Sequence, residues 1–176
     1  MYDRAGARRR AARAALLLLA AAQGLPGLWA LLWPAHFYGT YPVPGHPWVA
    51  GFPPYNEHLL HDTGAAGLAL GVLCACAAYS VQPQLVRAAA ASTLVFCVAH
   101  LVFHGAHLGR PFGAEEALQL FSLAAPVACA AVALLTTYGP PQRTPPTRAS
   151  DPDSAPVPVS RPAASVRRRP GKEETP

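Results

Sequence analysis

Three histidines near the end of one apolar stretch have residue types and spacing suited to metal ligation or proton transfer. His100, His104 and His107 are separated by four and then three residues. Residues at these spacings share one face of a helix, so the three imidazoles are predicted to lie on the same side. Imidazole nitrogens are ligands that suit zinc, copper and iron.

A second string places two carboxylates and two more histidines at the start of another apolar stretch. Glu57 and His61 are four residues apart, and so are His58 and Asp62. On a helix each pair would face the same way. Carboxylates and imidazoles together fit metal coordination, but no zincin-type His-Glu-x-x-His string is present.

The two strings are expected to meet inside a membrane bundle. At 1.5 Å per residue, His100 lies roughly 12 Å below the end of its helix, and Asp62 roughly 8 Å below the start of its own. Polar groups at such depth are costly in hydrocarbon and usually face a partner in the bundle interior. His36 or His46, in the loop at 34–56, could complete the ligand shell.

Three interpretations of this cluster are open. In the first, it only ties two helices together, with the carboxylates at a positive helix N-terminus and the histidines at a negative C-terminus. In the second, it binds zinc, copper or iron. In the third, two histidines ligate a haem, or the cluster handles protons or a quinone.

Four apolar runs must position these residues, and each is long enough to cross a bilayer. Charged residues make up only 13% of the 176-residue chain, against about 25% in soluble domains. The fold class is therefore predicted as an all-α membrane protein, a four-transmembrane-helix bundle with a disordered C-terminal tail. The predicted spans are about 14–33, 58–80, 85–108 and 116–138, joined by an outer loop at 34–56.

The arginines predict the orientation of these spans. The N-terminus at 1–13, the loop with Arg87 and the tail carry 13 of the 14 basic residues, and only an even number of spans places all three on one side. That side is predicted to be cytoplasmic, with both termini inside and the chain multi-pass in the inner (plasma) membrane. All seven histidines then lie on the outer side. Topology and anionic lipid explain the basic charge better than nucleic acid does.

Three further segments have predicted roles. The first span competes with a cleaved signal peptide, but its apolar run continues through Trp33, which favours a retained helix. The outer loop is rich in Pro, Gly and aromatic residues and is expected to lie on the membrane surface or to fold back over the bundle. The tail at 139–176 is rich in Pro, Ser, Thr and Arg and is expected to be disordered.

The four cysteines fall inside apolar runs and form no zinc or redox motif.

The two strings resemble segments of a family of small four-span bacterial membrane proteins that has no assigned activity. The resemblance rests on Pro-Pro-Tyr-Asn-Glu-His-Leu-Leu-His-Asp at 53–62 and on Ala-His-Leu-Val-Phe-His at 99–104 with His107 following, and it covers roughly 29–138. In layout alone the chain also looks like DoxX-type four-span proteins. The family pattern commonly has a basic residue other than histidine at the position of His61. The resemblance thus implies that His61 is a poorer ligand. His36 is also a less favoured candidate, and the six favoured ligands are Glu57, His58, Asp62, His100, His104 and His107.

Two functions follow as hypotheses. One is an integral membrane protein with a metal or haem site at the outer end of the bundle. The alternative is a non-catalytic component that contacts the lipid bilayer and a membrane-protein partner or a second copy of itself. The sequence names no substrate or reaction.

Overall fold

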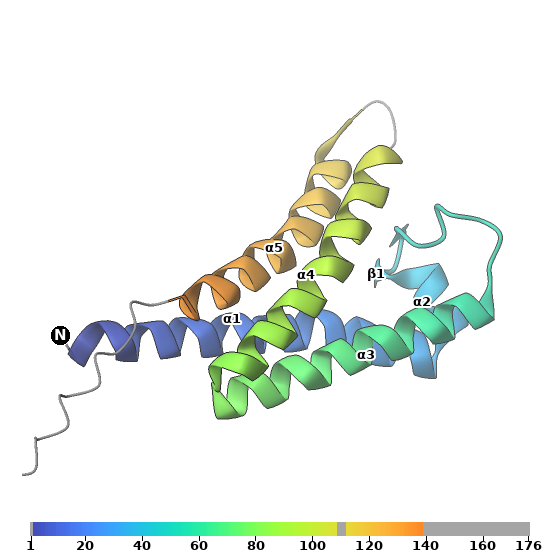
Figure 1. Cartoon of the computed structure of the whole chain (residues 1–176). Coiled ribbons are helices and arrows are strands. Elements are labelled where there is room, and N and C mark those ends of the chain that lie inside the picture. Colours follow the sequence, from blue (N-terminus) through green and yellow to red (C-terminus); the bar gives the residue numbers. More distant parts are fainter. Residues whose placement is uncertain (1, 109–111, 139–176) are drawn as a thin grey trace, which may run out of the picture. The chain divides into compact units, whose positions relative to one another are not determined.

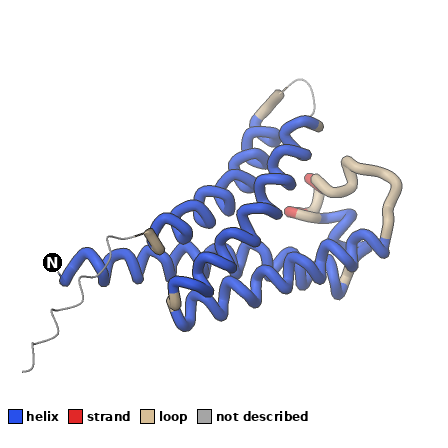
Figure 2. Tube along the Cα trace, in the orientation of Figure 1, coloured by secondary structure: helices blue, strands red, loops and turns tan. Residues whose placement is uncertain are grey.

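The computed structural model describes residues 2–108 and 112–138, so the predicted tail lies outside the described residues. These residues form five helices and one short hairpin (Figures 1 and 2). The elements in chain order are α1 (Tyr2–Leu32), α2 (Pro34–Thr40), β1 (Pro42–Val43), β2 (His46–Pro47), α3 (Glu57–Ser80), α4 (Pro83–Ala106) and α5 (Ala114–Thr136).

Four of these helices, α1, α3, α4 and α5, are long and apolar enough to cross a membrane. The predicted fold class, a four-span helical membrane bundle, is confirmed. The helix bounds of α3, α4 and α5 lie within two residues of the predicted spans. The orientation of the bundle across the membrane stays a prediction.

The first helix extends beyond the predicted span at 14–33. It begins at Tyr2 rather than near Ala14, because the alanines and arginines of the basic segment are strong helix formers that extend the apolar helix. Leu16 and Leu19 of α1 are fully buried in the bundle core. Retention of this helix, rather than its cleavage as a signal peptide, stays a prediction.

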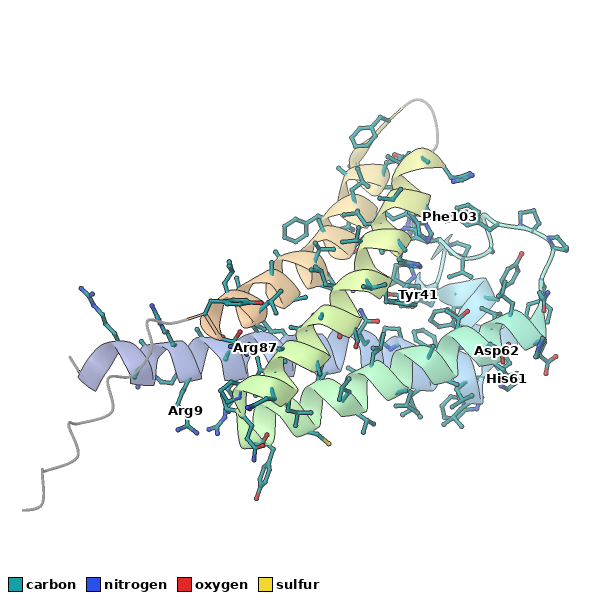
Figure 3. The ribbon with its side chains drawn as sticks, in the orientation of Figure 1. Arg9, Tyr41, His61, Asp62, Arg87 and Phe103 are labelled. Atoms are coloured by element: carbon teal, nitrogen blue, oxygen red, sulfur yellow. The ribbon has the colours of Figure 1, made fainter. Side chains whose placement is uncertain are left out.

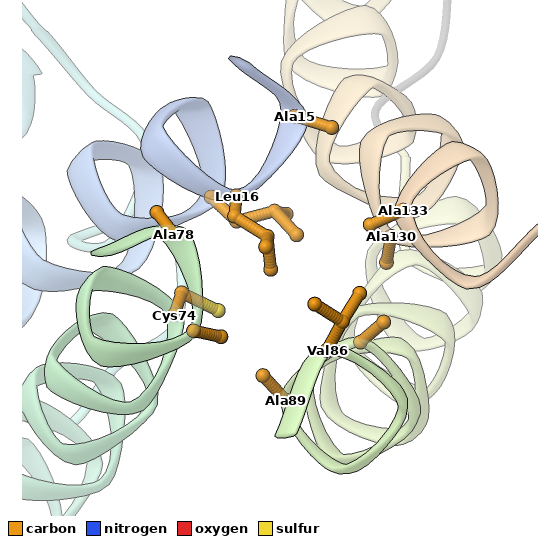
Figure 4. Close-up of a cluster of buried hydrophobic side chains, with 11 residues drawn as sticks. Ala15, Leu16, Cys74, Ala78, Val86, Ala89, Ala130 and Ala133 are labelled. Carbon is orange, nitrogen blue, oxygen red and sulfur yellow. The ribbon is translucent and has the colours of Figure 1, made fainter. Parts of the chain in front are cut away.

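Small residues let all four long helices meet at one end, which we call the arginine end because Arg13 and Arg87 lie there (Figure 4). Alanines contribute most of this core, with Leu16 of α1 and Val86 of α4 as its larger members. Arg13 donates from Nε to the Ala78 carbonyl at 3.1 Å, and Arg87 donates to the Thr137 carbonyl at 3.2 Å. These arginines thus bind the C-terminal carbonyls of α3 and α5, which complements the helix dipoles.

Glycines bring α1 and α3 into backbone contact. A Cβ added to Gly27 would lie 2.5 Å from the Leu68 nitrogen, and one added to Gly71 would lie 2.7 Å from the Gly24 Cα. Such close approach is typical of small-residue helix interfaces in membranes. The α1–α3 pair is therefore a tight unit along much of its length.

At the other end, α4 and α5 diverge from α1 and α3 (Figure 1). We call this the histidine-bearing end, because α1 and α4 end there, α3 and α5 begin there, and all seven histidines lie near it. The segment that joins α1 to α3, residues 33–56, folds back over the bundle. The sequence predicted either this position or one on the membrane surface. Its Phe37 is buried beside Ala30 and Leu60.

Candidate functional site

The carboxylates and histidines at the start of α3 form two pairs on an exposed surface. Asn56 caps the helix, accepting a hydrogen bond from the Leu59 N–H at 3.0 Å. His58 Nε2 lies 3.3 Å from Asp62 Oδ2, and these side chains are 87% and 66% exposed. His61 Nε2 lies 3.7 Å from Glu57 Oε1, also at the surface. The predicted four-residue pairing on one helix is confirmed.

The three histidines of α4 follow one another along the helix, as predicted. The ring centroids of His100 and His104 are 4.6 Å apart. Phe52, from the 33–56 segment, packs edge-on against His104 at 5.2 Å and against His107 at 6.1 Å. His107 is exposed, and its Nδ1 lies 2.8 Å from the Phe103 carbonyl, whereas His104 Nδ1 lies 3.2 Å from Gln119 Nε2 of α5.

The two strings do not meet as the sequence led us to expect. The divergence of α4 from α3 separates them, and the 33–56 segment lies between them, so Phe52 rather than a carboxylate contacts the α4 histidines. Figure 3 shows His61 and Asp62 near the start of α3, apart from Phe103 on α4. Within residues 2–108 and 112–138, no three His, Cys, Asp or Glu side chains are grouped to hold a metal ion. Metal binding therefore stays a prediction, and it has no ready-made ligand shell in the described part of the chain.

The two histidines of the 33–56 segment have other partners. His36 Nδ1 accepts a hydrogen bond from Trp29 Nε1 at 3.0 Å. His46 Nδ1 lies 3.6 Å from Glu115 Oε1 at the start of α5, which links this segment to the far helix pair. Neither arrangement completes a cluster with the α4 histidines.

The space between the diverging helix pairs is a cavity of about 680 Å³, and His100 and His104 lie on its wall. This volume falls in the range of roughly 300–1,000 Å³ that is typical of small-molecule sites. Residues from α1, α2, the 33–56 segment, α3, α4 and α5 line it. None of the α3 ion-pair residues does. The polar or aromatic members of the wall are Gln23, Phe37, Tyr41, Trp48, Phe52, Thr63, Phe96, His100, His104, Gln119 and Ser122.

His100 is the unusual member of this wall. Its ring stacks on Phe96 at 5.6 Å and meets His104 edge-on, but neither ring nitrogen has a hydrogen-bond partner among the described residues. Among the described residues, Trp48 Nε1 is the one fully buried side-chain nitrogen or oxygen without a hydrogen-bond partner. The unpartnered nitrogens of His100 are therefore not fully buried. The His100 imidazole, on the cavity wall, thus has polar atoms that remain open to a ligand or to water.

Two other wall residues carry polar groups, one on α1 and one at the end of α2. Gln23 of α1 donates from Nε2 to Cys97 Sγ at 3.1 Å, which fixes it beside α4 one turn from His100. Tyr41, at the end of α2, packs against Trp48, and burial raises the pKa of its phenol, so it stays neutral. The site is therefore a mainly apolar chamber with uncharged polar groups at fixed places.

Residue types and spacing indicate His100 and His104, but they do not reveal the cavity or its other polar residues. Gln23 and Gln119 are lone amides inside apolar runs, and Pro26 and Pro126 interrupt two spans. Isolated polar residues and prolines within membrane spans often line a cavity, so these four residues are a sequence signal for one. The aromatic residues of the 33–56 segment carried no such signal, because their place in the wall depends on the tertiary fold.

In comparisons with known proteins, the chain matches no protein-family model, no curated protein and no solved structure.

Proposed function

We propose that this integral membrane protein binds a lipophilic small molecule in the cavity at its histidine-bearing end. The observation that carries the proposal is the unpartnered imidazole of His100 on the wall of a cavity of about 680 Å³. A polar group facing an apolar chamber without a partner costs free energy, and a ligand with a complementary group would remove that cost. Binding sites of small molecules typically combine an apolar wall with a few such groups.

Ser122 offers a way to test occupancy of the cavity. It lines the chamber from α5, so Ser122→Phe would fill part of the volume, whereas Ser92→Phe adds the same side chain at an exposed position of α4 outside the wall. Each protein is purified in lipid nanodiscs, extracted with organic solvent, and the extract is quantified by mass spectrometry against empty nanodiscs. We expect a lipophilic compound near one equivalent with the wild type and with Ser92→Phe, and at least tenfold less with Ser122→Phe. Equal amounts in all three proteins, or none above empty nanodiscs, would contradict the proposal.

A second candidate function is binding of haem or a transition metal by the His100–His104 pair. It is favoured by the 4.6 Å separation of the two rings on the cavity wall, because imidazoles are common ligands of iron, copper and zinc. A further ligand would have to come from a second copy, from the bound group or from water. Metal analysis and the visible spectrum of the purified protein test it: a stoichiometric metal or a Soret band that His100→Ala abolishes is expected. A metal-free, colourless protein with no affinity for added zinc or copper would remove this candidate.

A further inference from the structure

The wall of the cavity carries no formal charge. No Asp, Glu, Lys or Arg is among the described residues that line it. A charged group moved from water into such a chamber would lose its hydration without gaining a counter-ion, which is strongly unfavourable. The wall therefore selects against phosphate, carboxylate and ammonium groups and favours a neutral polar group.

Two prolines leave backbone acceptors in the same wall. Pro26 of α1 and Pro126 of α5 have no N–H, so the carbonyls of Ala22 and Ser122, four residues earlier, lose their helical donors. All four residues line the cavity. The wall thus carries backbone acceptors that the helices leave unpaired. It also holds one unpartnered donor, Trp48 Nε1, but that atom is fully enclosed by protein.

Side chains add further acceptors near His100. Gln23 uses its amide nitrogen toward Cys97, and its carbonyl oxygen has no partner among the described residues. Ser122 lies three residues beyond Gln119, which contacts His104, so in the antiparallel α4–α5 pair it reaches about the level of His100. Acceptors from α1 and α5 and the imidazole of α4 therefore surround one region of the chamber.

We infer that the ligand of this cavity is a neutral lipophilic alcohol or phenol, whose hydroxyl donates to an acceptor on α1 or α5 and accepts from the imidazole of His100. This inference rests on the proposed function. A hydroxyl is both donor and acceptor, and it matches a neutral imidazole beside unpartnered carbonyl oxygens. A ketone or an ether only accepts, so it would give no donor to any of the acceptors of Gln23, Ala22 and Ser122, whereas a hydroxyl gives one.

Photolabelling in lipid nanodiscs tests the inference with a matched probe series. The probes are a diazirine-bearing sixteen-carbon alcohol, its methyl ether, which keeps the acceptor but loses the donor, and its phosphate monoester. We expect the alcohol to label peptides from α4 and α5 that line the cavity about tenfold more efficiently than either other probe, as one or two net hydrogen bonds would give. His100→Phe should lower labelling by the alcohol about tenfold, whereas His100→Gln, which keeps a donor and an acceptor, and the surface control His58→Ala should retain most of it.

The outcomes separate the ligand class from the proposed function. Equal labelling of the cavity by the alcohol and the ether would overturn the hydroxyl assignment while leaving a lipophilic ligand in the cavity. Preference for the phosphate monoester would overturn it in favour of a charged ligand. Labelling by every probe confined to lipid-facing peptides would overturn both proposals. The probe series on the wild type decides the matter even if His100→Phe does not fold.

Discussion

The contact between Gly24 of α1 and Gly71 of α3 allows a sharp test of how the bundle is packed. A Cβ on Gly71 would lie 2.7 Å from the Gly24 Cα, 2.8 Å from the Gly24 nitrogen and 3.1 Å from the Ala20 carbonyl oxygen. All three are backbone atoms and cannot move without moving the helix. A Cβ on Gly24, by contrast, would meet the Gly71 Cα at 3.7 Å, an ordinary contact. The same added methyl group is thus forbidden on one side of the contact and accommodated on the other.

The expected magnitude follows from these distances. Carbon atoms pack best at about 3.5–4.0 Å, so Gly71→Ala requires the two backbones to separate by about 0.8 Å. Such overpacking typically costs about 1–3 kcal/mol, and separation of the helices also loosens the neighbouring glycine contacts. We expect Gly71→Ala to lower the free energy of unfolding by about 2 kcal/mol and Gly24→Ala to change it by less than about 0.5 kcal/mol. Helix propensity changes equally in both variants and cancels in the comparison.

The free energy of unfolding of both variants can be measured by reversible unfolding in mixed micelles. Far-UV circular dichroism and tryptophan fluorescence follow the unfolding as the SDS fraction rises. Gly39→Ala, in α2, is a further control, because nothing lies within 4 Å of a Cβ at that position. If Gly71→Ala proves as stable as Gly24→Ala, the close approach of α1 and α3 is wrong. The position of the cavity, which that approach helps to define, would then be in doubt as well.

Three further predictions use the same unfolding measurement. Asn56→Ala removes the side chain that caps α3 at Leu59 and should lower stability by about 1 kcal/mol, whereas Asn56→Asp should retain it; equal loss in both would argue against the cap. Arg87→Met loses the hydrogen bonds to Thr137 and the cation–π contact to Tyr138, at 5.2 Å. It should lower the free energy of unfolding by about 0.5–1 kcal/mol more than the control Arg8→Met, near the start of α1, and high salt should reduce this difference. The double variant His58→Ala with Asp62→Ala should change stability by less than about 0.5 kcal/mol, because both side chains are exposed; a loss above about 2 kcal/mol would mean that they contact the bundle interior after all.

The helices could be predicted from the sequence because their determinants are local. Runs of apolar residues set the length of α3, α4 and α5, and Pro83 and the Asn56 cap set two of their starts. The apolar run predicts a first span that starts near Ala14, but the helix itself starts at Tyr2, because a basic segment of alanines and arginines also favours a helix. Spacing within a single helix is equally local, and His58 pairs with Asp62 across one turn as the sequence predicts.

The meeting of the two strings could not be predicted, because it depends on the angle between helices. Sequence spacing places His100 and Asp62 at similar depths but says nothing of how far apart their helices are at that depth. The alanine-rich core at the arginine end brings α3 and α4 together, and the aromatic 33–56 segment occupies the space between them at the other end. Phe52 therefore takes the place beside His104 that a carboxylate was expected to take.

This same arrangement explains why a polar residue can stay deep in the bundle without a protein partner. Where four helices pack through alanines there is no room for a ligand, and the polar side chains there, such as Thr93, have a partner within the bundle, in this case Cys74. Where the 33–56 segment holds the helix pairs apart, a chamber opens and His100 faces it. Because an unsatisfied imidazole is costly in an apolar chamber, its position there makes sense if something else supplies the hydrogen bonds. The lone polar residues within the spans, rather than the exposed histidine–carboxylate pairs, are thus the ones to mutate first in a search for function.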